Sequence, residues 1–131
     1  KDLMEIRFLI EPSIAAMAAI RADETDIKNI LTACENTEKL LLANKNHAEK
    51  DIAFHTAIAL SSKNIVVPKL VPIINSSIPL IRESAKLTMR DETIEIHREI
   101  ADAIAAHDAV RAHDAMYLHL IYNRKHIKSV N

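Results

Sequence analysis

Three histidines and one aspartate have the residue types and the spacing of metal ligands in a helical protein. Asp51 and His55 lie four residues apart within residues 48–59, so a helix would place both on one mostly apolar face. His97 and His119 each occur among apolar residues at helical spacing further along the chain. Burying such groups is costly unless each finds a partner. We therefore expect one divalent ion, Zn, Ni, Mn or Fe, held by all four side chains.

The composition favours an all-α fold for these segments. The chain has 131 residues, of which 49% are hydrophobic, 27% are charged and only 3% are aromatic. It contains no glycine, whereas a β-rich fold of this size normally uses glycine in its turns. We expect one domain, residues 1–131, with a helical core that is large enough to bury the polar cluster.

Charge, cysteine content and hydropathy exclude several classes of function. The net charge is −1, which gives no sign of a nucleic-acid-binding face. Cys34 is the single cysteine of the sequence, so it forms no internal disulfide, and we expect it to pack as a small apolar side chain in a cytoplasmic protein. No stretch has the roughly 18 consecutive apolar residues that a membrane span needs.

Hydrophobic periodicity and breaker residues predict six helical segments. The expected segments are about 2–20, from 23–25 to a polar break at 44–46, 47–60, a proline-rich stretch after residue 64 to about 81, from 91–93 to 106, and 108–128. Pro12 should kink or split the first segment, whose apolar ridge is expected to consist of Leu3, Ile6, Ile10, Ile14 and Met17. Asn64 and Asp108 are candidate N-caps.

The arrangement of short signatures along the chain resembles the FCD domain, the C-terminal effector-binding domain of FadR-type GntR transcription regulators. The matching segments are Glu5-Ile6-Arg7-Phe8-Leu9-Ile10-Glu11 followed by Ala15-Ala16-Met17-Ala18-Ala19; Asp51-Ile52-Ala53-Phe54-His55; Lys63-Asn64; His97-Arg98-Glu99-Ile100 with Ala103-Ile104; and Asp108 with Ala112, Met116 and His119-Leu120. They occur in the family's order and cover nearly the whole chain.

The resemblance implies an antiparallel bundle of six or seven helices. It also implies that the metal-binding branch of the family uses the positions of Asp51, His55, His97 and His119 as ligands, at the base of a pocket for a small organic acid. Arg7 would pair with the effector carboxylate through a bidentate fork. Arg82 and Asn64 are weaker candidates for contact with the effector.

The resemblance further implies how the domain is used. It implies a winged helix-turn-helix DNA-binding domain, which the given sequence does not contain and which we expect to lie N-terminal to it. It also implies a homodimer whose DNA binding responds to the effector.

Two other functions are compatible with the same residues. A metal held by three histidines and one aspartate, with open positions, could activate water in a hydrolase or act in an oxidoreductase. Such an enzyme would need a general base beside the metal, and the sequence offers no clear candidate. Alternatively, the four side chains could form a buried hydrogen-bond network in a metal-free structural or dimerising bundle. Removing a metal would then leave the stability unchanged.

Overall fold

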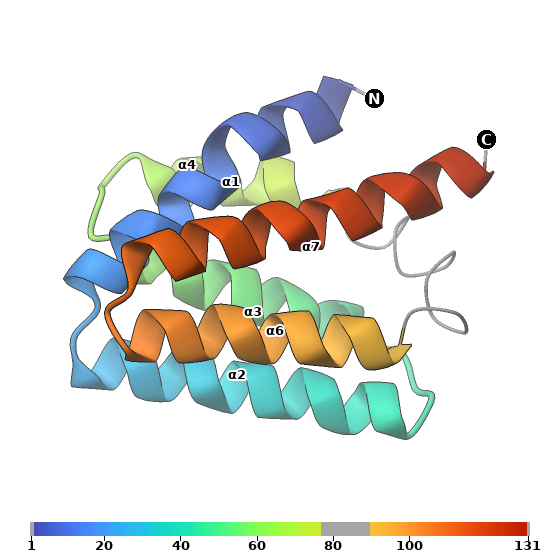
Figure 1. Cartoon of the computed structure of the whole chain (residues 1–131), viewed down its shortest axis with the longest axis horizontal. Coiled ribbons are helices and arrows are strands. Elements are labelled where there is room, and N and C mark those ends of the chain that lie inside the picture. The colour runs from blue at the N-terminus through green and yellow to red at the C-terminus, as the bar shows by residue number, and fades with distance from the viewer. Residues whose placement is uncertain (1, 77–89, 131) are drawn as a thin grey trace.

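The described part of the chain is built from helices alone. The computed structural model describes residues 2–76 and 90–130, with side chains to residue 125. Within these ranges there is no strand, and six helices follow one another: α1 (Asp2–Arg21), α2 (Glu24–Leu42), α3 (Ala48–Ser61), α4 (Val67–Asn75), α6 (Arg90–Ala105) and α7 (Ala109–Val130). They form the antiparallel all-α bundle that the sequence predicted (Figure 1).

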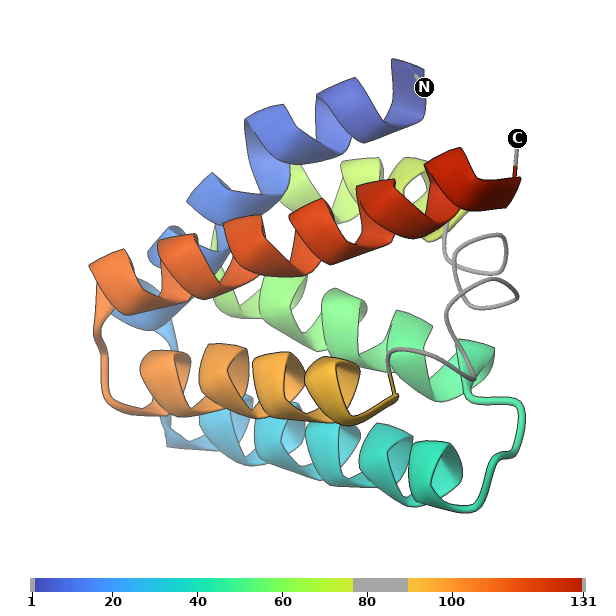
Figure 2. The ribbon, with the colours of Figure 1, turned by 45° about the vertical axis from the view of Figure 1, so that its right-hand side comes forward.

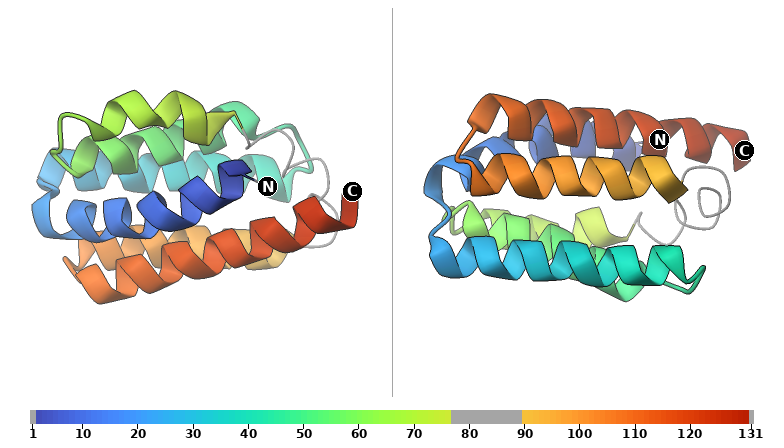
Figure 3. Two further views of the ribbon diagram at one scale, coloured as in Figure 1. Left: turned by 90° about the horizontal axis from the view of Figure 1, so that it is seen from above. Right: turned by 60° about the horizontal axis from the view of Figure 1, so that its bottom comes forward.

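The helices pack so that the inner faces of four of them meet. α1 packs against α7 along its length and also contacts α3, α4 and α6, while α2 packs against α3 and α6 (Figure 2). Seen from above, α1 lies between α4 and α7 (Figure 3). The inward side chains of α1, α3, α6 and α7 therefore share one interior, and helices distant in sequence can each supply a group to one site.

Polar side chains fix where two helices begin. Asp23 is the N-cap of α2: its carboxylate accepts a hydrogen bond from the backbone nitrogen of Asp26 at 2.8 Å, and the Asp26 carboxylate accepts one from the backbone nitrogen of Asp23 at 3.0 Å. This is a capping box, which satisfies two donors that the first turn would leave unpaired. Asp108 lies at the start of α7, where its carboxylate accepts a single hydrogen bond from the backbone nitrogen of Arg111 at 3.1 Å. Both starts were predicted.

Pro12 does not split the first helix, because α1 is continuous from Asp2 to Arg21. The alternative that Pro12 kinks the helix stays a prediction. The prediction that Asn64 is an N-cap was wrong. The N-cap of α4 is Val66 rather than Asn64. The Asn64 side chain instead accepts a hydrogen bond from the backbone nitrogen of Val66 at 2.9 Å, which forms a turn just before the helix. The predicted continuation of this segment to residue 81, including Pro79, lies outside the described residues.

The buried face of α1 also differs from the predicted apolar ridge. Ile6 is 44% exposed, and Leu3, Ile10 and Met17 are only partly buried. Ile14 is buried as predicted, but the face that enters the core also carries small and charged residues: Met4, Arg7, Glu11, Pro12, Ile14, Ala15, Ala18 and Ala19. Small alanines let α7 and α3 approach closely, and the two charged residues can be buried because they pair with each other. The charged pair therefore faces the interior together with Met4 and Ile14, while Ile6 does not.

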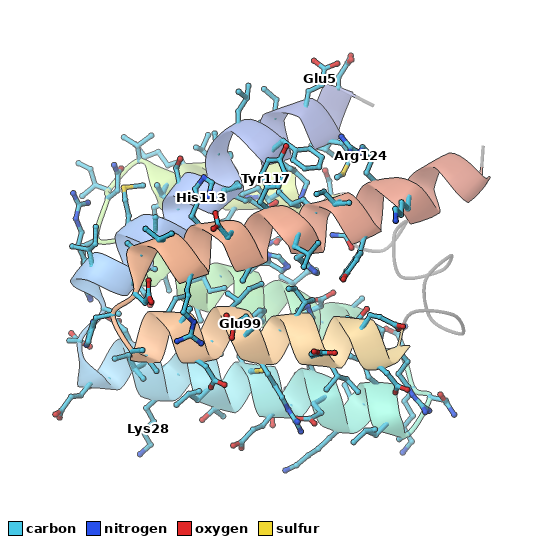
Figure 4. All side chains as sticks on the ribbon, viewed as in Figure 1. Glu5, Lys28, Glu99, His113, Tyr117 and Arg124 are labelled. Atoms are coloured by element: carbon cyan, nitrogen blue, oxygen red, sulfur yellow. The ribbon has the colours of Figure 1, made fainter. Side chains whose placement is uncertain are left out.

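The rest of the core follows the helical pattern. Ile94, His97, Ile100, Ala101 and Ile104 form the buried face of α6 as predicted. Cys34 is buried, and burial raises the pKa of its thiol to about 11, with the nearby carboxylates of Glu38 and Asp102 adding to the effect. This cysteine is a packing residue. Lys28 on α2 and Glu99 on α6 lie on the outside of the bundle (Figure 4).

We predict that Ile30→Ala lowers the free energy of unfolding by about 2–5 kcal/mol, because Ile30 is fully buried and its removal leaves a cavity. Ile20→Ala is the matched control, since Ile20 is 68% exposed on α1 and its truncation should change stability by under about 0.5 kcal/mol. Urea unfolding of both variants measures the difference. Equal effects would contradict the assignment of the core.

Candidate metal centre

Helix α3 supplies two of the predicted ligands. Asp51 and His55 lie one turn apart, and their side chains are 13% and 4% exposed respectively. The carboxylate oxygen Oδ1 of Asp51 is 3.8 Å from Nε2 of His55. This distance is too long for a hydrogen bond. The two groups therefore face the same space without satisfying each other.

Helices α6 and α7 bring the other two imidazoles to this point. The ring of His97 lies 4.9 Å from the ring of His119, and the ring of His119 lies 5.6 Å from that of His55, measured between ring centres. Each histidine can offer one nitrogen such that the three atoms all lie within 4.8 Å of one another, and all three residues are buried. Three helices thus converge on one point, as the periodicity predicted.

The carboxylate of Asp51 lies beside this histidine group. Its Oδ1 is 3.6 Å from Nε2 of His97, close to its 3.8 Å separation from His55. Two ligands of one tetrahedral zinc ion, each about 2.1 Å from the metal, would lie about 3.4 Å apart. The separations around Asp51 are therefore close to those of ligands that share an ion, and too long for direct hydrogen bonding.

The polar atoms at this point are poorly satisfied by the protein itself. Within residues 2–76 and 90–125, both ring nitrogens of His97 lack a hydrogen-bond partner. The Oδ1 atom of Asp51 also lacks one. An unsatisfied buried polar group costs about 1–3 kcal/mol, and native structures contain few of them. Nε2 of His97 and Oδ1 of Asp51 face each other at 3.6 Å, and an imidazole nitrogen and a carboxylate oxygen so placed suit a borderline divalent ion. The residues present therefore fit a metal.

Burial keeps the imidazoles of His97 and His119 in the form that binds metal. It lowers the pKa of His97 to about 4, and the nearby carboxylate of Asp51 offsets only part of this effect. Burial also lowers the pKa of His119 well below its usual range, and the charges of His97, His55 and Arg7 lower it further. A neutral imidazole has a free lone pair, which metal coordination requires.

The sequence interpretation gave no role to Glu11, which the structure places in contact with the site. The Glu11 carboxylate lies in the buried interior and makes two contacts. Its Oε1 is 3.0 Å from Nδ1 of His55. Its Oε2 accepts a hydrogen bond from Nε of Arg7. Burial alone would raise the pKa of Glu11, but the charge of Arg7 and the contacts with His55 lower it to about 2. Glu11 is therefore ionised at neutral pH.

An ionised Glu11 determines which nitrogen of His55 faces the cluster. A carboxylate only accepts hydrogen bonds, so Nδ1 of His55 must carry the hydrogen that lies toward Glu11. The lone pair is then on Nε2, the nitrogen on the side of Asp51. A carboxylate that holds the remote nitrogen of a histidine is a common partner of metal-ligating imidazoles. The sequence signal that could have identified this contact is an arginine and a glutamate four residues apart, Arg7 and Glu11, on the helix face that also carries Ile14 and Ala18.

The three residues predicted to contact an effector have different surroundings. Arg7 is completely buried, and its guanidinium contacts Glu11 and, at 4.0 Å, the sulfur of Met4. Asn64 is held in the turn before α4. Arg82 lies outside the described residues. Of the predicted effector residues that the structure describes, Arg7 is the one near the histidine cluster. It contacts Glu11, and Glu11 contacts His55.

A small cavity borders Glu11 and His55. Its volume is about 10 Å³, and its walls include Val71 and Ile74 of α4 and Met116 of α7. A single water needs at least about this volume. In this conformation there is no room for an organic molecule between α4 and the Glu11–His55 pair.

Comparison with known proteins identifies the family. Residues 2–121 match the FCD domain family. The chain is 30% identical to the HTH-type transcriptional regulator LutR of Bacillus subtilis, covering 92% of this chain and 58% of LutR. It is 34% identical to a putative L-lactate dehydrogenase operon regulatory protein of Escherichia coli, covering 92% of this chain and 48% of that protein. The solved structure of Streptococcus agalactiae GntR has a TM-score of 0.83 and 35% identity, over 95% of this chain and 57% of that chain.

The chain therefore belongs to the FCD domain family. The relatives that it matches are named as transcription regulators. The chain spans about half the length of the curated relatives it matches. In the described residues, no helix combines the length and the hydrophobicity that crossing a bilayer requires.

We predict that the metal-free protein loses stability as the pH falls from 6.5 to about 4. Unfolded His97 takes up a proton near its ordinary pKa of 6.5, whereas the folded state resists protonation down to about 4. The unfolded state then binds more protons, so acid favours unfolding, by up to roughly 3 kcal/mol for this residue. Urea unfolding in chelator across this pH range measures the effect.

His113→Gln is the control for this experiment. His113 lies on the outer side of α7 beside Tyr117, with its side chain 45% exposed (Figure 4). The variant should keep the pH dependence of the parent protein, whereas His97→Gln should reduce it. Stability that is constant or rises from pH 6.5 to 4.5 would contradict the neutral burial of His97.

Proposed function

We propose that this domain senses a small organic acid through a divalent metal ion held by Asp51, His55, His97 and His119. The observation that supports this most strongly is the convergence of three buried imidazoles beside the carboxylate of Asp51, where the ring nitrogens of His97 and Oδ1 of Asp51 lack hydrogen-bond partners among the described residues. A metal-free bundle would leave these atoms unsatisfied in the interior. Four protein ligands on an ion that accepts five or six leave positions for an effector.

The bound ion would act as a Lewis acid toward a carboxylate oxygen of the effector. The protein residues supply orientation and exclusion of water. His55 is held in its ligating tautomer by Glu11, while His97 and His119 lie in the apolar core with Phe54, whose ring is 4.9 Å from that of His97. In such a dry site, each charge interaction is stronger than at the surface.

Arg7 is the second group that we propose for effector binding. It lies beside Glu11, one contact away from His55, so a small acid bound to the ion is within reach of its guanidinium. The named relative that regulates an L-lactate dehydrogenase operon supports a small hydroxy acid as the class of effector. Because the cavity at Glu11 and His55 has a volume of about 10 Å³, an effector there must displace its α4 wall, Val71 and Ile74.

The wider function follows from the family. We propose that residues 1–131 act as one sensing domain in a cytoplasmic homodimer, attached to an N-terminal winged helix-turn-helix that binds DNA. Effector binding would pull α1, α3, α6 and α7 toward the ion and shift α4. This rearrangement would change the spacing of the DNA-binding domains, which couples the two sites.

We predict one bound metal ion per chain after purification or after loading with Zn²⁺, Ni²⁺, Mn²⁺ or Fe²⁺. His97→Ala and His119→Ala should each remove most of this metal, because each deletes one ligand from a set of four. Elemental analysis and the melting temperature in the presence and absence of chelator provide the measurement. Since metal binds the folded state, loading should raise the melting temperature.

His113→Ala is the matched control for metal content, since this exposed histidine of α7 lies outside the buried cluster. A metal-free structural bundle makes the opposite prediction: no stoichiometric metal with any of the four ions, and a melting temperature that chelator leaves unchanged. That result would refute the proposed metal centre.

We predict that L-lactate or a similar acid binds the metal-loaded domain and fails to bind after chelation. Arg7→Lys should weaken binding by roughly tenfold, because lysine keeps the charge but loses the fork that pairs with a carboxylate. Isothermal titration calorimetry measures both effects. Binding that survives chelation and the Arg7→Lys change would contradict the proposed pocket.

A further inference from the structure

We propose that Glu11 sets the charge of the effector, so that the site selects an acid with a single carboxylate over one with two. This inference rests on the proposed metal-dependent acid site and names the class of molecule that it accepts. It follows from the charges that the described residues bring together in the interior. Neither the family assignment nor the names of the relatives assign Glu11 a role.

Arg7 and Glu11 form a neutral pair. The Arg7 guanidinium and the Glu11 carboxylate are both buried and in direct contact, and Glu11 also contacts His55. A buried ion pair is stable only when its two charges compensate each other in good geometry. The positive charge of Arg7 is therefore already balanced before any effector arrives. Arg7 can orient a carboxylate, but it adds no net charge to attract a second one.

The proposed divalent ion and its four protein ligands would carry a net charge of plus one. The three imidazoles are neutral as ligands, since each must offer a lone pair. Asp51 carries one negative charge and offsets one of the two charges of a divalent ion. Among the described residues, two further groups act on these imidazoles: Arg7 acts on His119, and His47 acts on His97.

One carboxylate brings this interior to neutrality. A second carboxylate on the same small molecule would be buried without a compensating charge, which is strongly unfavourable in a site with little water. An uncharged analogue would leave the positive charge of the ion and its ligands uncompensated. The charge balance therefore favours a monoanion, and it depends on Glu11, because removing that carboxylate would leave two positive charges.

Titration calorimetry with three probes of one carbon length tests this inference. The probes are 2-hydroxybutyrate with one carboxylate, malate with two, and 2-hydroxybutyramide with none, titrated into the zinc-loaded domain at pH 8. We expect 2-hydroxybutyrate to bind at least about tenfold more tightly than either of the others, since an uncompensated buried charge costs more than this factor requires. Elemental analysis after each titration verifies that zinc stays bound.

Glu11→Gln keeps the shape of the side chain and removes its charge. In this variant the preference should shift toward malate by about tenfold or more, because the interior then carries a second positive charge. Glu99→Gln is the matched control: Glu99 lies on the outer side of α6 paired with Arg111, so the preference should stay as in the parent protein (Figure 4).

The outcomes separate this inference from the proposed function. Malate binding as tightly as 2-hydroxybutyrate to the parent protein overturns the charge selection and leaves the acid site intact. An unchanged preference in a folded, zinc-loaded Glu11→Gln variant overturns the role of Glu11. Binding of none of the probes, with zinc retained, overturns both proposals. If the variant loses zinc or its helical circular dichroism, the charge selection is judged from the affinities of the three probes for the parent protein.

Discussion

The interior of this bundle is constrained by polar groups that the helices bury together. Three helices supply these groups, which are Asp51, His55, His97 and His119. The helical spacing of each residue relative to its apolar neighbours turns its side chain inward. Burial removes water from atoms that need partners, and the protein itself leaves Asp51 and His97 poorly satisfied. The proposed cation would give Asp51 and His97 the partners that the described protein atoms do not supply.

The second constraint is the charged pair on α1. Arg7 and Glu11 occupy positions where a helix of this kind normally buries large apolar side chains, and the aliphatic Ile6 is exposed instead. The arrangement links α1 to α3, because Glu11 contacts His55 while it holds Arg7. The same carboxylate therefore contacts a proposed metal ligand, neutralises the arginine and lines the cavity beside α4. Through this contact, effector binding at the proposed ion would reach α1 and α4.

Sequence periodicity predicted the fold and the histidine cluster because both depend on which face of a helix is apolar. His97 is inward because Ile94, Ile100, Ala101 and Ile104 are, and the same reasoning holds for His119. The method failed for Glu11, since periodicity assigns a charged residue to the solvent unless its partner is known, and the partner here is a second charged residue one turn away. It also misplaced the start of α4, where a turn through Asn64 precedes the helix and tertiary packing decides the boundary. The effector contact expected of Arg82 lies outside the described residues.

X-ray absorption spectroscopy at the metal edge tests the central claim most directly, on protein loaded with one equivalent of zinc and freed of excess ion. The account predicts nitrogen or oxygen ligands at about 2.0–2.2 Å together with the multiple-scattering pattern of three imidazoles. A spectrum with only water-like oxygen ligands, or with one imidazole or none, would show that the buried histidines do not hold the ion and would contradict the account.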